Sequence, residues 1–215
     1  MNQEAAPKPR LRGWIHLAAF PIAIAAGLIL VATGPTQAAR LAAAIYVATS
    51  AALFGVSALY HRSRLSPAAT AWLKRIDHAN IYLIIAGTYT PVAVLALGGA
   101  ARAWLLTIIW TGAIAGVVFR TLWVGAPRWL YTALYIVLGW AAVFVMPQLA
   151  DGAGVLATVL IIGGGVLYTA GGVIYGLKRP DPSPSWFGFH EVFHSFTLAA
   201  YIAQFAAVAL VVQSA

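Results

Sequence analysis

The sequence predicts an all-α protein, a polytopic membrane bundle of seven helices. The chain has 215 residues, of which 62% are hydrophobic and only 8% are charged. A soluble domain carries about 25% charged residues, so too few charges remain here to cover a surface that faces water. The hydrophobic residues also gather in long runs, each close to the roughly 20 residues that a helix needs to cross a bilayer.

The apolar runs are separated by short connections, so runs that follow one another should pack as antiparallel helices. The predicted spans are Trp14–Thr33, Leu41–Tyr60, Ile76–Leu97, Ala103–Phe119, Trp129–Leu149, Gly154–Leu177 and Phe187–Val212. The fourth is the shortest, and Pro147 is expected to kink the fifth. The first run has the basic start of a cleaved signal peptide, but it exceeds the usual length of about 7–15 apolar residues, which favours a retained helix.

The connections differ in charge according to the side on which they lie. One side holds only Arg40 and Arg102, and the other holds all the remaining lysines and arginines. Because basic loops stay in the cytoplasm, the N-terminus is predicted inside and the C-terminus outside. We therefore expect a short basic cytoplasmic tail over residues 1–13 and a single seven-helix domain over residues 14–215.

Charge and cysteine content exclude two other classes of protein. The net charge of +8 is distributed over short loops and does not form one basic stripe, which argues against nucleic-acid binding. The chain has no cysteine, so it forms no disulfide framework and no thiolate metal site. A metal ion would therefore have to be held by His, Asp, Glu or water.

Ionisable side chains inside membrane spans are costly and usually functional, and the predicted topology gathers several of them at one depth. His61 ends the second span, which runs toward the cytoplasm. Asp77 lies at the start of the third span, and His190 and His194 lie in the first turns of the seventh. Three helices that are distant in sequence thus bring these side chains near the cytoplasmic face.

The spacing of the histidines indicates a metal site. His190 and His194 are four residues apart and share one face of a helix, an arrangement known from zinc proteins. A third histidine from another helix would complete a site that keeps its fourth position open, as catalytic zinc centres do. Ser57 lies one turn from His61 on the same face. The alternative is a set of structural histidines satisfied by hydrogen bonds, and the shared depth favours the metal.

Three further ionisable residues receive other interpretations. His16 lies near the basic edge of the first span and is expected to form hydrogen bonds at the membrane interface rather than to bind a metal. Glu191 follows His190 and should point elsewhere, in an interfacial or capping role. For His78 two interpretations stay open, a supporting contact to the site or a position at the interface.

Three motifs, taken together and in this order, resemble the bacterial hemolysin III proteins of the progestin and adipoQ receptor family. They are Ser57-Ala-Leu-Tyr-His61, the segment Asp77-His78-Ala-Asn-Ile-Tyr that continues to Thr90-Pro91, and His190-Glu-Val-Phe-His194. The resemblance covers essentially the whole chain. It implies a seven-helix bundle with its N-terminus inside and a zinc ion near the cytoplasmic side. The implied zinc ligands are His61, His190 and His194, with Asp77 acting through water and Ser57 lining the site.

The wider superfamily includes alkaline ceramidases, so the resemblance also implies an activity. The leading hypothesis is a Zn²⁺-dependent hydrolase of lipid amide or ester bonds, with Asp77 and Ser57 as catalytic residues. Its partners would be membrane lipids in the bacterial inner (plasma) membrane, and its role would be lipid homeostasis. The alternative is a non-catalytic sensor, receptor or cytolytic protein with structural zinc. A haem or proton-relay bundle is disfavoured, because His190 and His194 share one helix.

Overall fold

The computed structural model describes residues 8–123 and 125–215, so Glu4 and the rest of residues 1–7 lie outside the described residues. Within these ranges, seven helical segments are long and apolar enough to cross a membrane. This confirms the all-α class and the number of candidate spans. The segments are α1 (Trp14–Thr33), α2 (Gln37–Arg62), α3 (Pro67–Ala96), α4 (Gly99–Leu122), a fifth span over Arg128–Ala153, α7 (Val155–Leu177) and α8 (Phe189–Gln213).

Several helices extend beyond the apolar runs that predicted them. The helix α3 begins at Pro67 instead of Ile76, and α4 covers Gly99–Leu122, so the expectation that the fourth span is the shortest is wrong. The start of α3 is fixed by capping, because the Ser66 hydroxyl accepts a hydrogen bond from the Ala69 N–H at 3.3 Å. Hydropathy marks where a helix meets lipid, whereas its ends depend on such local hydrogen bonds.

The fifth span is interrupted rather than merely kinked. It consists of α5 (Arg128–Gly139), a short 3₁₀ helix, η1 (Ala141–Val145), and α6 (Met146–Ala153). Pro147 lies in the first turn of α6, where its missing N–H costs nothing. The proline that predicted a kink therefore starts a new helical piece.

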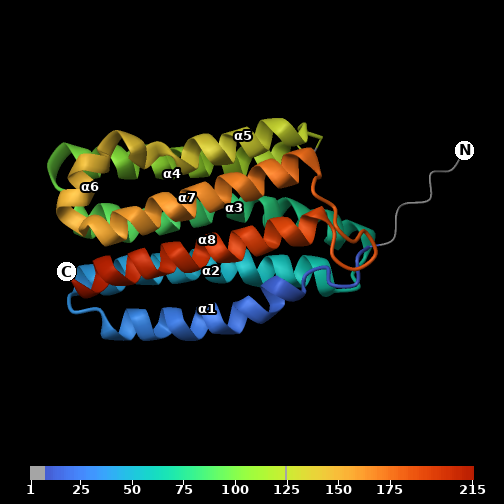
Figure 1. Cartoon of the computed structure of the whole chain (residues 1–215), viewed down its shortest axis with the longest axis horizontal. Coiled ribbons are helices and arrows are strands. Elements are labelled where there is room, and N and C mark those ends of the chain that lie inside the picture. Colours follow the sequence, from blue (N-terminus) through green and yellow to red (C-terminus); the bar gives the residue numbers. More distant parts are fainter. Residues whose placement is uncertain (1–7, 124) are drawn as a thin grey trace, which may run out of the picture.

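The long helices lie side by side, and α1 begins at the end of the bundle opposite to the end of α8 (Figure 1). The helix α8 packs against α7 and also contacts α1, α2 and α3. The starts of α1, α3 and α8 and the end of α2 therefore share one end of the bundle. We call it the basic end, because all lysines and arginines of the described residues except Arg40 and Arg102 belong to helix ends or connections there.

The N-terminal segment ahead of α1 is tied to the connection between α7 and α8. The Arg10 N–H donates to the Ser185 carbonyl at 3.0 Å, and the Leu11 N–H donates to the Trp186 carbonyl at 3.1 Å. In the first turn of α8 lies Glu191, whose carboxylate accepts a hydrogen bond from the Gly188 N–H at 2.9 Å. The capping role expected for Glu191 is therefore confirmed.

The predicted orientation in the membrane can be tested with single cysteines, since the chain has none of its own. Arg64→Cys lies in the exposed connection after α2, and Gly98→Cys lies in the exposed connection before α4, at the opposite end. We expect a membrane-impermeant maleimide to label Gly98→Cys in intact cells, and Arg64→Cys only after permeabilisation. The reverse pattern would contradict the orientation inferred from loop charge.

Candidate metal centre

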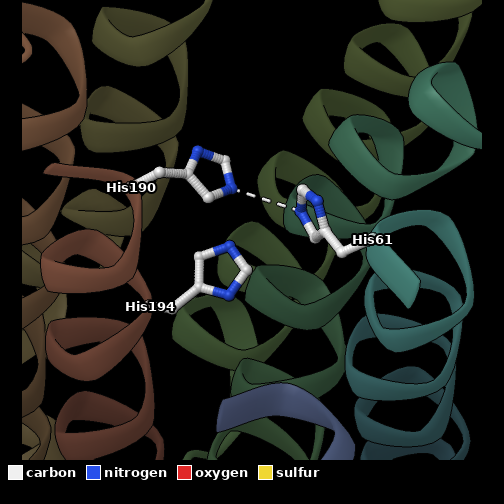
Figure 2. Close-up of side chains that lie close together, drawn as sticks. All are labelled: His61, His190 and His194. Atoms are coloured by element: carbon white, nitrogen blue, oxygen red, sulfur yellow. Dashed lines mark hydrogen bonds between the residues drawn. The ribbon is translucent and has the colours of Figure 1, made fainter. Parts of the chain in front are cut away.

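Three histidines from two helices converge at the basic end. His61 lies in the last turn of α2, and His190 and His194 lie in the first two turns of α8. Each offers a ring nitrogen, and these nitrogens all lie within 4.8 Å of one another. Figure 2 shows the three rings facing a common space, with His61 approaching from the opposite side to the α8 pair. The structure thus brings together the set that the spacing predicted.

The geometry of this cluster fits a metal ion. Tetrahedral zinc with Zn–N bonds of about 2.0–2.1 Å requires ligand nitrogens roughly 3.3 Å apart. The Nε2 atoms of His61 and His190 are 3.2 Å apart, which is close to this spacing and is also within hydrogen-bonding distance. Neutral imidazoles suit zinc and several transition metals. The cluster could therefore hold an ion with little movement of His61 and His190.

A glycine beside His61 lets the chain pass close to the site. Gly13, just before α1, has a left-handed backbone with φ of 82°. A Cβ atom built there would lie 2.6 Å from the Cβ of His61, which no side chain tolerates without movement. The absence of a side chain at Gly13 therefore allows the start of α1 to pack directly against His61.

A narrow cavity of about 120 Å³ adjoins the histidine cluster. His190 and His194 line one end of it, together with Asp77 and the buried Ser57. Along α3 the lining continues from Asp77 to Tyr89, a length of roughly 18 Å at the helical rise of about 1.5 Å per residue. The rest of the lining is largely apolar and includes Leu53, Ile81, Ile84, Ile85, Ile136, Trp140 and Phe193.

His16 is buried inside the bundle, so the expected position at the membrane interface is wrong, whereas the expected hydrogen bond is present. Its side chain is 3% exposed, lines the same cavity, and places Nδ1 2.8 Å from the Ser57 hydroxyl. The ring also stacks on that of His194, with centroids 3.8 Å apart. The depth argument that gathered the other histidines applies to His16 as well, because it lies in the first turn of a span that starts at the same end.

His78 faces the interior of the bundle, which resolves the two interpretations left open for it. Its Nδ1 lies 2.8 Å from the Lys74 carbonyl, and its Nε2 lies 3.1 Å from the Tyr175 hydroxyl. It also lines the cavity. His78 therefore supports one wall of the cavity and ties α3 to α7, at a position next to Asp77.

Comparison with known proteins now identifies the family. The profile of the "Haemolysin-III related" family matches residues 5–205. The chain belongs to this family. It is 37% identical to the hemolysin-3 homolog of Bacillus subtilis (strain 168) over 134 residues. This aligned segment covers 62% of this chain and 60% of that protein. The chain is 31% identical over 163 residues to hemolysin-3 of Bacillus cereus, which covers 76% and 71% respectively.

This haemolysin-III family chain is expected to bind close to one equivalent of zinc when purified in detergent. His61→Ala and His190→Ala should each lose most of it, because two imidazoles alone hold the ion weakly. Asp77→Ala should keep it. Metal analysis by mass spectrometry measures all four proteins, and full retention of zinc in either histidine variant would contradict the three-ligand arrangement.

Gly13→Ala should weaken metal binding about tenfold by displacing His61, besides costing about 1 kcal/mol or more for the left-handed backbone. Gly154→Ala is the matched control, because Gly154 has φ of 81° and nothing within 4 Å of its Cβ position. Both variants should lose thermal stability, and only Gly13→Ala should also lose zinc affinity. Equal zinc affinities of the two variants would show that the close approach of the Gly13 backbone does not position His61.

Proposed function

We propose that this membrane protein is a zinc-dependent hydrolase that cleaves an amide or ester bond of a membrane lipid. The main support for this proposal is the cavity. Two imidazoles of the cluster, Asp77 and Ser57 line one end of it, and the rest of its lining is largely apolar. Metal ligands, a carboxylate and a hydroxyl at the end of an apolar channel suit a substrate with a polar bond and a long chain.

His61, His190 and His194 would hold the zinc. Three neutral protein ligands leave a coordination position free, which is the pattern of catalytic rather than structural zinc. When bound, the ion would polarise a carbonyl oxygen and lower the pKa of water in the site. The membrane surroundings keep bulk water away, which strengthens each of these interactions.

Asp77 would act as the general base. Its carboxylate lines the cavity beside Ser57 and lies 3.7 Å from the Nδ1 of His78, too far for a hydrogen bond, so His78 would not prevent it from accepting a proton from water. It would then pass this proton to the leaving amine or alcohol. Ser57 would either donate a hydrogen bond to the developing oxyanion or hold one of the metal ligands in place.

The cavity and its surroundings support a lipid as the substrate. The stretch from Ile81 to Tyr89 would accommodate part of an acyl chain, since its lining is largely apolar. At the basic end, Arg62, Arg64 and Lys74 would favour an anionic headgroup. The same charges also serve as the signal for orientation in the membrane, so the acyl chain is the stronger of the two arguments.

The second candidate is a non-catalytic membrane protein with a structural metal. The names of the two Bacillus relatives, hemolysin-3 and a hemolysin-3 homolog, favour a cytolytic role. Asp77 separates the two candidates, because a structural site needs the three histidines and no base.

We expect Asp77→Asn to lower hydrolysis at least 100-fold without loss of zinc, since a positioned general base contributes about 10²–10⁴-fold. The assay uses purified protein in lipid nanodiscs with a fluorescent short-chain ceramide and its ester analogue. Asp151→Asn is the matched control, because Asp151 is exposed in α6. Wild-type turnover in Asp77→Asn, or turnover that survives removal of the metal by a chelator, would contradict the proposal.

A further inference from the structure

His16 is the fourth histidine at the basic end, and the proposed mechanism gives it no task. It lies in the first turn of α1, on a different helix from the three proposed ligands. Its ring is held in place by the edge of Phe54, with centroids 5.1 Å apart and planes at 86°. A polar ring buried this deeply inside a membrane bundle is costly, so its two contacts within the site need a reason.

The first contact is with Ser57. Nδ1 of His16 lies 2.8 Å from the Ser57 hydroxyl oxygen, and both side chains are buried. A buried hydroxyl needs a hydrogen-bond partner, and His16 provides one to Ser57. The orientation of the Ser57 hydroxyl therefore depends on α1 as well as on its own helix, α2.

The second contact is with the ring of His194. The two imidazoles stack, with centroids 3.8 Å apart and planes inclined by only 21°. His16 does not belong to the set of histidines whose ring nitrogens lie within 4.8 Å of one another, among the described residues. It covers one face of His194 instead, and a flat neighbour at this distance resists rotation of that ring.

The free nitrogen of His16 decides which group donates to Ser57. Its Nε2 is buried and has no hydrogen-bond partner among the described residues. A neutral imidazole carries one proton, and an orphaned buried N–H is rarer than an unsatisfied acceptor. We therefore assign the proton to Nδ1, which donates to the Ser57 oxygen. The Ser57 O–H is then left to donate into the cavity, where the Asp77 carboxylate is its polar neighbour.

We propose that His16 is a positioning residue with two separable tasks: it directs the Ser57 hydroxyl into the cavity, and it fixes the ring of His194 for metal binding. The second task requires only that the histidine cluster binds a metal ion. The first rests on the proposed function, because it makes Ser57 a donor to the oxyanion of a lipid amide or ester, rather than a support for a metal ligand.

Two substitutions separate these tasks. His16→Phe keeps an aromatic ring on His194 and removes the hydrogen bond to Ser57. His16→Asn keeps an N–H donor near Ser57 and removes the ring. Supporting residues around a metal typically contribute about 10–100-fold in affinity or activity. His16→Phe should therefore lose a factor in this range in turnover, and His16→Asn should lose such a factor in zinc affinity. His16→Ala should lose both.

The measurements use purified full-length protein with Zn²⁺ competed against a chelating dye, and with the fluorescent short-chain ceramide as the probe of turnover. His16→Phe should bind zinc like wild type and lose kcat with KM unchanged. His16→Asn should bind zinc more weakly than the wild type. At saturating zinc it should keep more of the wild-type kcat than His16→Phe does. In a Ser57→Ala background, His16→Phe should cost no further turnover, because the two residues act as one unit.

Leu30→Ala is the control for packing, because Leu30 is equally buried in α1 but lies far from the site. A merely structural role would make His16→Phe, His16→Asn and Leu30→Ala lose zinc affinity and turnover together with thermal stability, and this result would overturn the proposal. So would wild-type zinc affinity in His16→Ala. If the wild type cleaves no lipid probe, the proposed function fails, and the zinc affinities of His16→Phe and His16→Asn still decide the task at His194.

Discussion

The contact between His61 and His190 is the interaction on which the rest of the basic end depends. It joins α2 to α8 through two ring nitrogens 3.2 Å apart, at partly buried positions where water satisfies them poorly. An imidazole in such a place must share a proton or a metal ion with a neighbour. The close passage of Gly13 beside His61 and the stack of His16 on His194 both follow from where these rings meet.

A partly buried ion pair closes the same end of the bundle. The guanidinium of Arg12 donates to the carboxylate of Glu191, which is 2% exposed and also caps α8. Removing one partner of such a pair leaves an uncompensated charge, which typically costs about 3–5 kcal/mol. Because Glu191 directly follows His190, this ion pair anchors the N-terminal segment to the turn of α8 that presents His190 to the histidine cluster.

The spans and the clustering of His61, His190 and His194 could be predicted because hydropathy locates the helices and loop charge gives them a direction. Depth follows from direction, so a residue near one end of a span can be placed without knowledge of packing. The start of α3 at Pro67 could not be placed, since a hydroxyl cap and not lipid determines it. His16 was misplaced for a related reason: a position near a basic edge is typical of the interface, and only packing shows that α1 turns this ring inward.

The contacts of the other carboxylates leave Asp77 as the candidate general base. Glu191 is committed to Arg12 and to the start of α8, and Asp181 accepts a hydrogen bond from the backbone at the same helix start. Asp151 is exposed in α6. Among the described residues, Asp77 is therefore the acid that lines the cavity. Zinc held by three neutral imidazoles would bring two positive charges, and Asp77 would offset only one. The net positive charge that remains would stabilise the negative charge that develops on a carbonyl oxygen during hydrolysis.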